Sequence, residues 1–224
     1  SGFAGIEKGP KFVLEIAVMT GFSMLLFGTL LGKGARDIPR MILTGVILGV
    51  LFRSVSGLVT RLMDPNEFAV VQSVTVPSFS RIDPVLLPYG VVIALLAIAA
   101  SLWLALRLDV IALGRDVAVS LGLRYDRLVL IALALIAVLV SVSTAMVGPV
   151  TFFGLVVAGL AHSFARSARH RVLLPFAALI AATILIGGQT LFERMLGQVA
   201  TLSVVVDFIG GLFFLTLLLR GQIR

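Results

Sequence analysis

Long continuous runs of apolar residues, separated by short polar segments, dominate this chain of 224 residues. A helix that crosses a bilayer needs about 20 mostly apolar residues. The pattern predicts seven such spans, at 11–31, 41–61, 86–106, 128–147, 150–165, 172–190 and 203–219. Membrane strands are excluded because the runs are continuous rather than alternating. We therefore predict an all-α integral membrane protein, a bundle of helices that forms one transmembrane domain over 1–224.

The composition excludes a water-soluble enzyme. Hydrophobic residues make up 59% of the chain and charged residues 13%, about half the share in soluble domains. With a mean hydropathy of +1.15, too little polar surface remains to coat a soluble globule. The net charge of +7 lies in short loops between spans, so we predict no nucleic-acid partner. The absence of cysteine excludes disulfides and thiolate metal sites.

The basic residues of the loops predict the orientation. The loops 32–40, 107–127 and 162–171, together with the end of the chain, carry twelve Lys and Arg residues, against five on the opposite side. The positive-inside rule places the first set, and the C-terminus, in the cytoplasm. Ser1 and the long loop 62–85 then lie outside, and within that loop 66–76 is predicted to form a short helix.

The cytoplasmic loop 107–127 holds a short amphipathic segment. Its apolar residues recur at helical spacing, and a glycine stands at each end. The apolar face comprises Leu113, Val117, Ala118 and Leu121. A short helix held between two spans can fit a groove on a soluble partner and transmit a movement of that partner to the membrane helices. The alternative is a helix that rests on the lipid surface. The candidate coupling residues are Leu113, Gly114, Arg115, Asp116, Val117, Ser120, Leu121 and Gly122.

Three ionisable residues, Glu15, Arg53 and Asp207, fall inside the predicted spans. Such groups are costly in hydrocarbon and usually face a bundle interior or a watery cavity. Arg53 is eight residues from Arg61, about 12 Å below the outer end of its helix. We predict a polar outward-facing funnel lined by Arg53 and Asp207. The alternatives are snorkelling or a structural ion pair of Arg53 with Asp207 or Glu15.

Motifs of soluble catalysis are absent from the sequence. Gly32-Lys33-Gly34 lacks the spacing of a phosphate-binding loop, and no nucleophile elbow or paired zinc-binding histidines occur. His162 and His170 lie at a cytoplasmic helix end with no carboxylate near them in sequence, and are interpreted as interfacial. We therefore predict no catalytic residue, no metal ligand and no cofactor in this chain, so any ATP and Mg are expected on a partner.

Four separate stretches resemble one family, the iron-chelate uptake ABC permeases of the FecCD type. They are the coupling segment 112–122, the stretch 148–156 that begins Gly-Pro-Val-Thr-Phe-Phe-Gly, the cytoplasmic turn 170–175, and the last apolar segment 208–219. The segments 63–68 and 151–154 are similar to the subgroup that imports ferric catecholate-type siderophores. The chain departs from the family pattern at 158–159, where Ala-Gly replaces the usual Pro-His.

The resemblance implies a transport subunit in a bacterial inner membrane, and not an enzyme. It implies ten spans, three of them before Ser1, a second permease subunit, two cytoplasmic ATPases and an outer substrate-binding protein, with a ferric siderophore as cargo. Arg194 matches a family arginine that docks the binding protein, and Arg81 is added by its location. The rival interpretation is an ion-coupled secondary transporter or channel, which would need carboxylates or broken helices near the membrane midplane.

Overall fold

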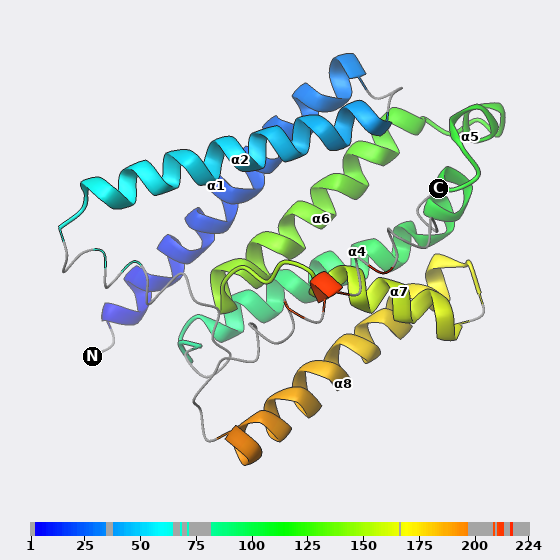
Figure 1. The fold of residues 1–224 in the computed structure, drawn as a ribbon. Helices are drawn as coiled ribbons and strands as arrows, with labels where there is room; N and C mark the ends of the chain where they lie inside the picture. Colours follow the sequence, from blue (N-terminus) through cyan, green and yellow to red (C-terminus); the bar gives the residue numbers. More distant parts are fainter. Residues whose placement is uncertain are drawn as a thin grey trace.

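The computed structural model describes residues 3–34, 38–64, 68, 71, 82–165, 167–196, 208, 210–212 and 216. Regular structure in this part of the chain is helical. Its elements are α1 (Phe3–Gly34), α2 (Ile38–Leu62), α4 (Leu87–Ile111), α5 (Arg115–Ser120), α6 (Tyr125–Val147), α7 (Phe153–Ala165) and α8 (His170–Leu196). The long helices run up and down past one another, and α5 lies at the end of the bundle where α4 ends and α6 begins (Figure 1). The predicted all-α fold is confirmed.

Five of the predicted spans are confirmed as helices long and apolar enough to cross a membrane. These are Lys8–Gly28, Leu43–Leu62, Leu87–Ile111, Tyr125–Val147 and His170–Leu191. The span predicted at 203–219 lies largely outside the described residues. The short outer helix predicted at 66–76 does too, although Phe68 donates its N–H to the Asp64 carbonyl at 2.9 Å, as in a helical turn.

The fifth predicted span, 150–165, is shorter than the sequence suggested. Gly148 has φ +100°, a left-handed conformation that turns the chain sharply after α6. The helix begins at Phe153 and not at 150, since the Val156 N–H reaches back to the Phe152 carbonyl at 3.2 Å. At 13 residues, α7 is about 20 Å long, against about 30 Å of hydrocarbon.

A cluster of buried apolar residues lies where α1, α4 and α6 meet. Phe12 and Ile16 of α1 and Val142 of α6 are almost fully buried there. Thr20 of α1 donates a hydrogen bond of 3.3 Å to the buried hydroxyl of Ser141 on α6. In a membrane, where lipid is as apolar as leucine, helices associate through such close packing and interhelical hydrogen bonds.

An ion pair joins the starts of α1 and α4. Lys8 Nζ lies 2.8 Å from Asp83 Oδ2, and Asp83 Oδ1 accepts the Val85 N–H at 3.0 Å. The hydrogen bond from Lys8, and then that from Val85, hold the pKa of the Asp83 carboxyl below its ordinary value. The carbonyl of Asp83 also accepts the N–H groups of Leu86 and Leu87. Asp83 therefore fixes both the start of α4 and its position beside α1.

Gly210 packs against Phe152 in the connection between α6 and α7. A Cβ at Gly210 would lie 2.5 Å from the Phe152 Cβ, an atom that cannot swing away because it is bonded to the backbone. Phe152 and Gly210, which are distant in sequence, therefore meet at a point with no room for a methyl group.

We expect Gly210→Ala to destabilise the protein by about 1–3 kcal/mol through overpacking. The measurement is thermal unfolding of the purified protein in detergent. Gly187→Ala is the matched control, since a Cβ at Gly187 would meet no atom within 4 Å. Equal stability of the two variants would show that the close contact at Gly210 does not contribute to the free energy of unfolding.

Candidate functional site

Two glycines set the path of the chain around α5. Gly114 has φ +102° and Gly122 has φ +82°, conformations that are strained for any residue with a Cβ. Gly114 turns the chain out of α4, and its carbonyl accepts the Ala118 N–H at 3.1 Å as α5 begins. The predicted short helix bracketed by glycines is confirmed.

The side chains of this segment divide between the bundle and the exterior. Leu113, Val117 and Leu121 are exposed by 64%, 44% and 61%, and we call these three residues the apolar stripe. The prediction that Ala118 shares this face was wrong, because its side chain is fully buried. Since α5 packs against α4 and α6, the buried side chain of Ala118 faces the bundle. On a helix of six residues, sequence spacing alone could not distinguish side chains that face the bundle from side chains that face the exterior.

Polar contacts hold α5 beside the start of α6. Arg115 Nη2 lies 3.1 Å from Asp126 Oδ2, and the guanidinium carbon is 5.8 Å from the centre of the Tyr125 ring. Ser120 donates its hydroxyl hydrogen to the Asp116 carbonyl at 2.8 Å. An exposed ion pair stabilises by only about 0–1 kcal/mol. These polar contacts therefore set the orientation of α5 but contribute little to its stability. The burial of Ala118 against the bundle holds α5 in place.

A second polar contact near α5 was missed in the sequence. Asp109, two residues before the end of α4, accepts hydrogen bonds from the backbone N–H and from Nδ1 of His170, the first residue of α8, at 2.7 and 2.6 Å. The interpretation of His170 as interfacial therefore missed a carboxylate partner that is distant in sequence. Since 61 residues separate the two, no spacing pattern indicates this contact. His162, by contrast, hydrogen-bonds within its own helix to the Ala158 carbonyl.

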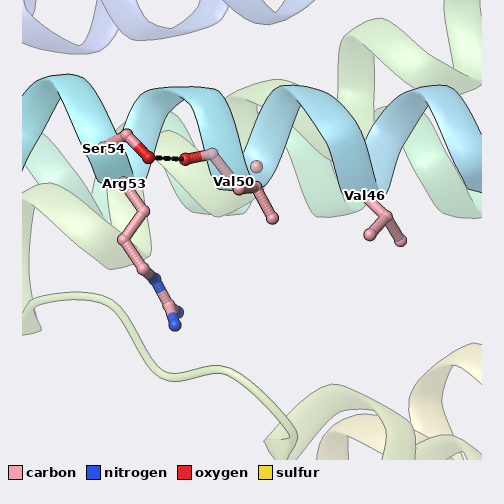
Figure 2. Close-up of a pocket in the computed structure, with 5 residues that line it drawn as sticks. Val46, Val50, Arg53 and Ser54 are labelled. Atoms are coloured by element: carbon pink, nitrogen blue, oxygen red, sulfur yellow. Dashed lines mark hydrogen bonds between the residues drawn. The ribbon is translucent and has the colours of Figure 1, made fainter.

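One face of α2 borders an open hollow of about 380 Å³. Its lining residues recur at helical spacing, and they are Val46, Gly49, Val50, Arg53 and Ser54. Figure 2 shows Val46, Val50 and Arg53 pointing from α2 to the same side. The hydroxyl of Ser54 is bonded to the Val50 carbonyl of its own helix at 2.9 Å. Among the described lining residues, Arg53 carries the charge.

Arg53 lies near the middle of its span. It is nine residues before Leu62, about 14 Å along an apolar segment that runs from Leu43 to Leu62. This depth agrees with the sequence-based value of about 12 Å below the outer end of the helix. Among the described residues, no ion pair joins Arg53 to Glu15, which is exposed on α1.

The remaining predicted site residues are only partly described. Arg194 is exposed in the last turn of α8, at the opposite end of that helix from Asp109 and His170. Arg81 and Asp207 lie outside the described residues, so their contribution to docking or to the pathway stays a prediction. Among the residues that the structure does describe, no three His, Asp or Glu side chains gather as a metal site would require.

A bundle of membrane-length helices, with a short exposed helix at one end and a charged residue within a span, is typical of membrane transport proteins. The chain belongs to the FecCD transport family, whose family model matches residues 5–220. The resemblance stated from the four sequence stretches is confirmed.

Individual relatives agree with this family. The chain is 38% identical to the petrobactin import system permease protein YclO of Bacillus subtilis over 216 residues, which cover 96% of this chain and 68% of the relative. It is 36% identical to the petrobactin import system permease protein FatC of Bacillus anthracis, covering 95% of this chain and 60% of the relative. It is 30% identical to the ferric enterobactin transport system permease protein FepD of Escherichia coli, covering 93% and 68%.

A solved structure supports the same fold. An ABC transporter of the metal-chelate type, in an inward-facing conformation, superposes with a TM-score of 0.74 at 26% identity, over 87% of this chain and 65% of that one. The chain thus spans about two thirds of the length of the proteins it matches. The predicted class, a multi-pass ABC importer permease rather than an enzyme, agrees with these relatives.

Proposed function

We propose that this chain is the permease subunit of an ABC importer that carries a ferric siderophore inward across a bacterial inner membrane. The relatives support this cargo, because their import systems are those of petrobactin and ferric enterobactin. ATP and Mg bind two cytoplasmic ATPase subunits, and a second permease subunit and an outer binding protein complete the assembly. The C-terminus lies in the cytoplasm, as the distribution of basic loops favours.

The single observation that carries the ATP-driven mechanism is the exposed apolar stripe. Three large apolar side chains stand at the bundle end that the basic loops place in the cytoplasm. A groove on the ATPase would remove them from water, while buried Ala118 holds the segment against α4 and α6. A displacement of the ATPase then reaches two spans as a rigid shift and alternates access to the pathway.

Arg53 gives the pathway its preference for an anionic chelate. Placing a guanidinium in the middle of a span costs free energy, and this cost is lowest where the side chain faces a water-filled route. A positive charge in a cavity with low-dielectric walls concentrates anions there. We assign Asp207 to the same pathway from its sequence position alone.

A crosslink tests the ATPase contact. Since the chain has no cysteine, Ser120→Cys introduces a single thiol on exposed α5. In the assembled transporter we expect it to crosslink to the ATPase subunit through a short thiol-to-amine reagent. Ser101→Cys, within α4 and partly buried, is the control and should give no such product. Absence of the Ser120→Cys product in an intact assembly would remove the docking function from α5.

Charge reversal at Arg194 tests docking of the binding protein. We expect Arg194→Glu to lower the association rate about tenfold and to reduce its dependence on salt, because a long-range attraction becomes a repulsion. Surface-based binding kinetics at several ionic strengths measure both effects. The matched control is Arg61→Glu, the same change in the last turn of α2. Equal loss with both variants would show that general charge, and not Arg194, governs docking.

A further inference from the structure

Asp109 stands at a junction between α5 and α8. It precedes α5 by six residues, and a chain of backbone hydrogen bonds crosses this short distance. The N–H of Leu113 reaches the Val110 carbonyl at 3.2 Å, and that of Gly114 reaches the Ile111 carbonyl at 3.0 Å. The last turn of α4 and the first turn of α5 are therefore connected closely enough to shift together.

The carboxylate of Asp109 takes the place of a local cap on α8. Helix N-termini leave backbone N–H groups without partners, and a side chain just before the helix usually accepts one of them. Here the acceptor comes from a different helix, because Asp109 lies in α4. Its Oδ1 accepts the backbone N–H of His170 at 2.7 Å and the ring Nδ1–H of His170 at 2.6 Å. Both side chains are about one quarter exposed, which makes these bonds stronger than freely solvated ones.

The first turn of α8 depends on this outside support. Pro175 has no N–H, so one backbone bond, that to the Arg171 carbonyl, is missing near the start of an otherwise continuous α8. From His170, α8 continues for 27 residues, about 40 Å, and ends close to Arg194. Its far end thus lies at the outer side, where the binding protein is proposed to dock.

We propose that Asp109 and His170 are positioning residues that form the mechanical joint between the ATPase-coupling segment and α8. A shift of α5 moves the end of α4. The hydrogen bonds from His170 to Asp109 then make the start of α8 move together with the end of α4. ATP binding is thereby transmitted to the outer end of the transporter along one continuous helix. This inference rests on the proposed function, since it requires an ATPase that displaces α5.

Thiol labelling in the assembled transporter tests the joint without any cargo. Leu191 is 60% exposed near the outer end of α8, and Leu191→Cys is the single thiol of the chain. We expect its labelling rate to change at least about fivefold when a non-hydrolysable ATP analogue is added. In the Asp109→Ala background the rate should no longer respond to the nucleotide. Asp109→Asn, whose amide oxygen can still accept both bonds, should restore the response.

Ser167→Ala is the matched control. The hydroxyl of Ser167 accepts the Arg169 N–H at 3.3 Å, so the variant removes a hydrogen bond in the turn just before α8 and leaves the bond to α4 intact. It should respond to the nucleotide like the parent chain. If Asp109→Ala does not assemble, His170→Ala carries the same test, because it keeps the backbone bond and should lose part of the response.

Three results would overturn the joint: an unchanged response in both the Asp109→Ala and His170→Ala backgrounds, an equal loss in Ser167→Ala, or no response in the parent chain. Uptake of a ferric siderophore by the same assemblies, measured in parallel, judges the proposed cargo separately. Lack of uptake with an intact labelling response would contradict the cargo and leave the joint standing.

Discussion

Replacing Val117 with Asp should reduce ATP-driven uptake by at least about a hundredfold while the bundle stays folded. Val117 is 44% exposed on α5, so its own helix tolerates the change. In the docked state, however, the variant would bury a carboxylate without a partner in an apolar groove, and an uncompensated buried charge costs about 3–5 kcal/mol. Uptake into vesicles and co-purification of the ATPase measure the effect.

Val119 provides the control for Val117. It lies on the same short helix and is 54% exposed, but it is two residues away and thus on the opposite side of α5. We expect Val119→Asp to keep most of the uptake and the bound ATPase. If the two variants lose activity equally, or Val117→Asp keeps its ATPase, the apolar stripe is not the contact surface.

Substitution of Arg53 with Gln should lower uptake at least about tenfold without weakening assembly. The guanidinium faces an open hollow and has no ion-pair partner among the described residues, so its removal breaks no described salt bridge. An anionic chelate would lose the attraction of a positive charge held in a cavity with low-dielectric walls. Initial uptake rates over a range of chelate concentrations measure the change.

Two variants sharpen the test at Arg53. Arg53→Lys keeps the positive charge and should retain more uptake than Arg53→Gln. Ser54→Ala alters the neighbouring hollow residue, whose hydroxyl is bonded to its own helix, and should behave like the parent chain. Normal uptake with Arg53→Gln would leave Arg53 a structural residue with no contribution to transport.

Periodicity and length were sufficient to predict most of the bundle. A run of 20 or more apolar residues has one stable form in lipid, a helix with its backbone bonds satisfied internally, so five spans were found with small errors at their ends. The short helix α5 was predictable for a different reason. Glycines at 114 and 122 marked two places where the backbone takes a left-handed conformation.

The tertiary contacts were not predictable from the sequence. The direction of Ala118 depends on which neighbours α5 meets, and α4 and α6 are set by the whole bundle. The bond between Asp109 and His170 joins residues that no local pattern relates. The late start of α7 also had no clear signal, because Pro149 is acceptable both in a first helical turn and in the irregular turn where it lies.

Uptake of a ferric siderophore by proteoliposomes, with the ATPase subunits present or stripped away, tests the central claim most directly. The transporter contains this chain, its partner permease and the binding protein in both cases. We expect uptake to require the ATPase together with ATP and Mg, and to fall to the rate of empty liposomes without them. Uptake that continues unchanged after removal of the ATPase would contradict the account, and would indicate an ion-coupled carrier or a channel instead.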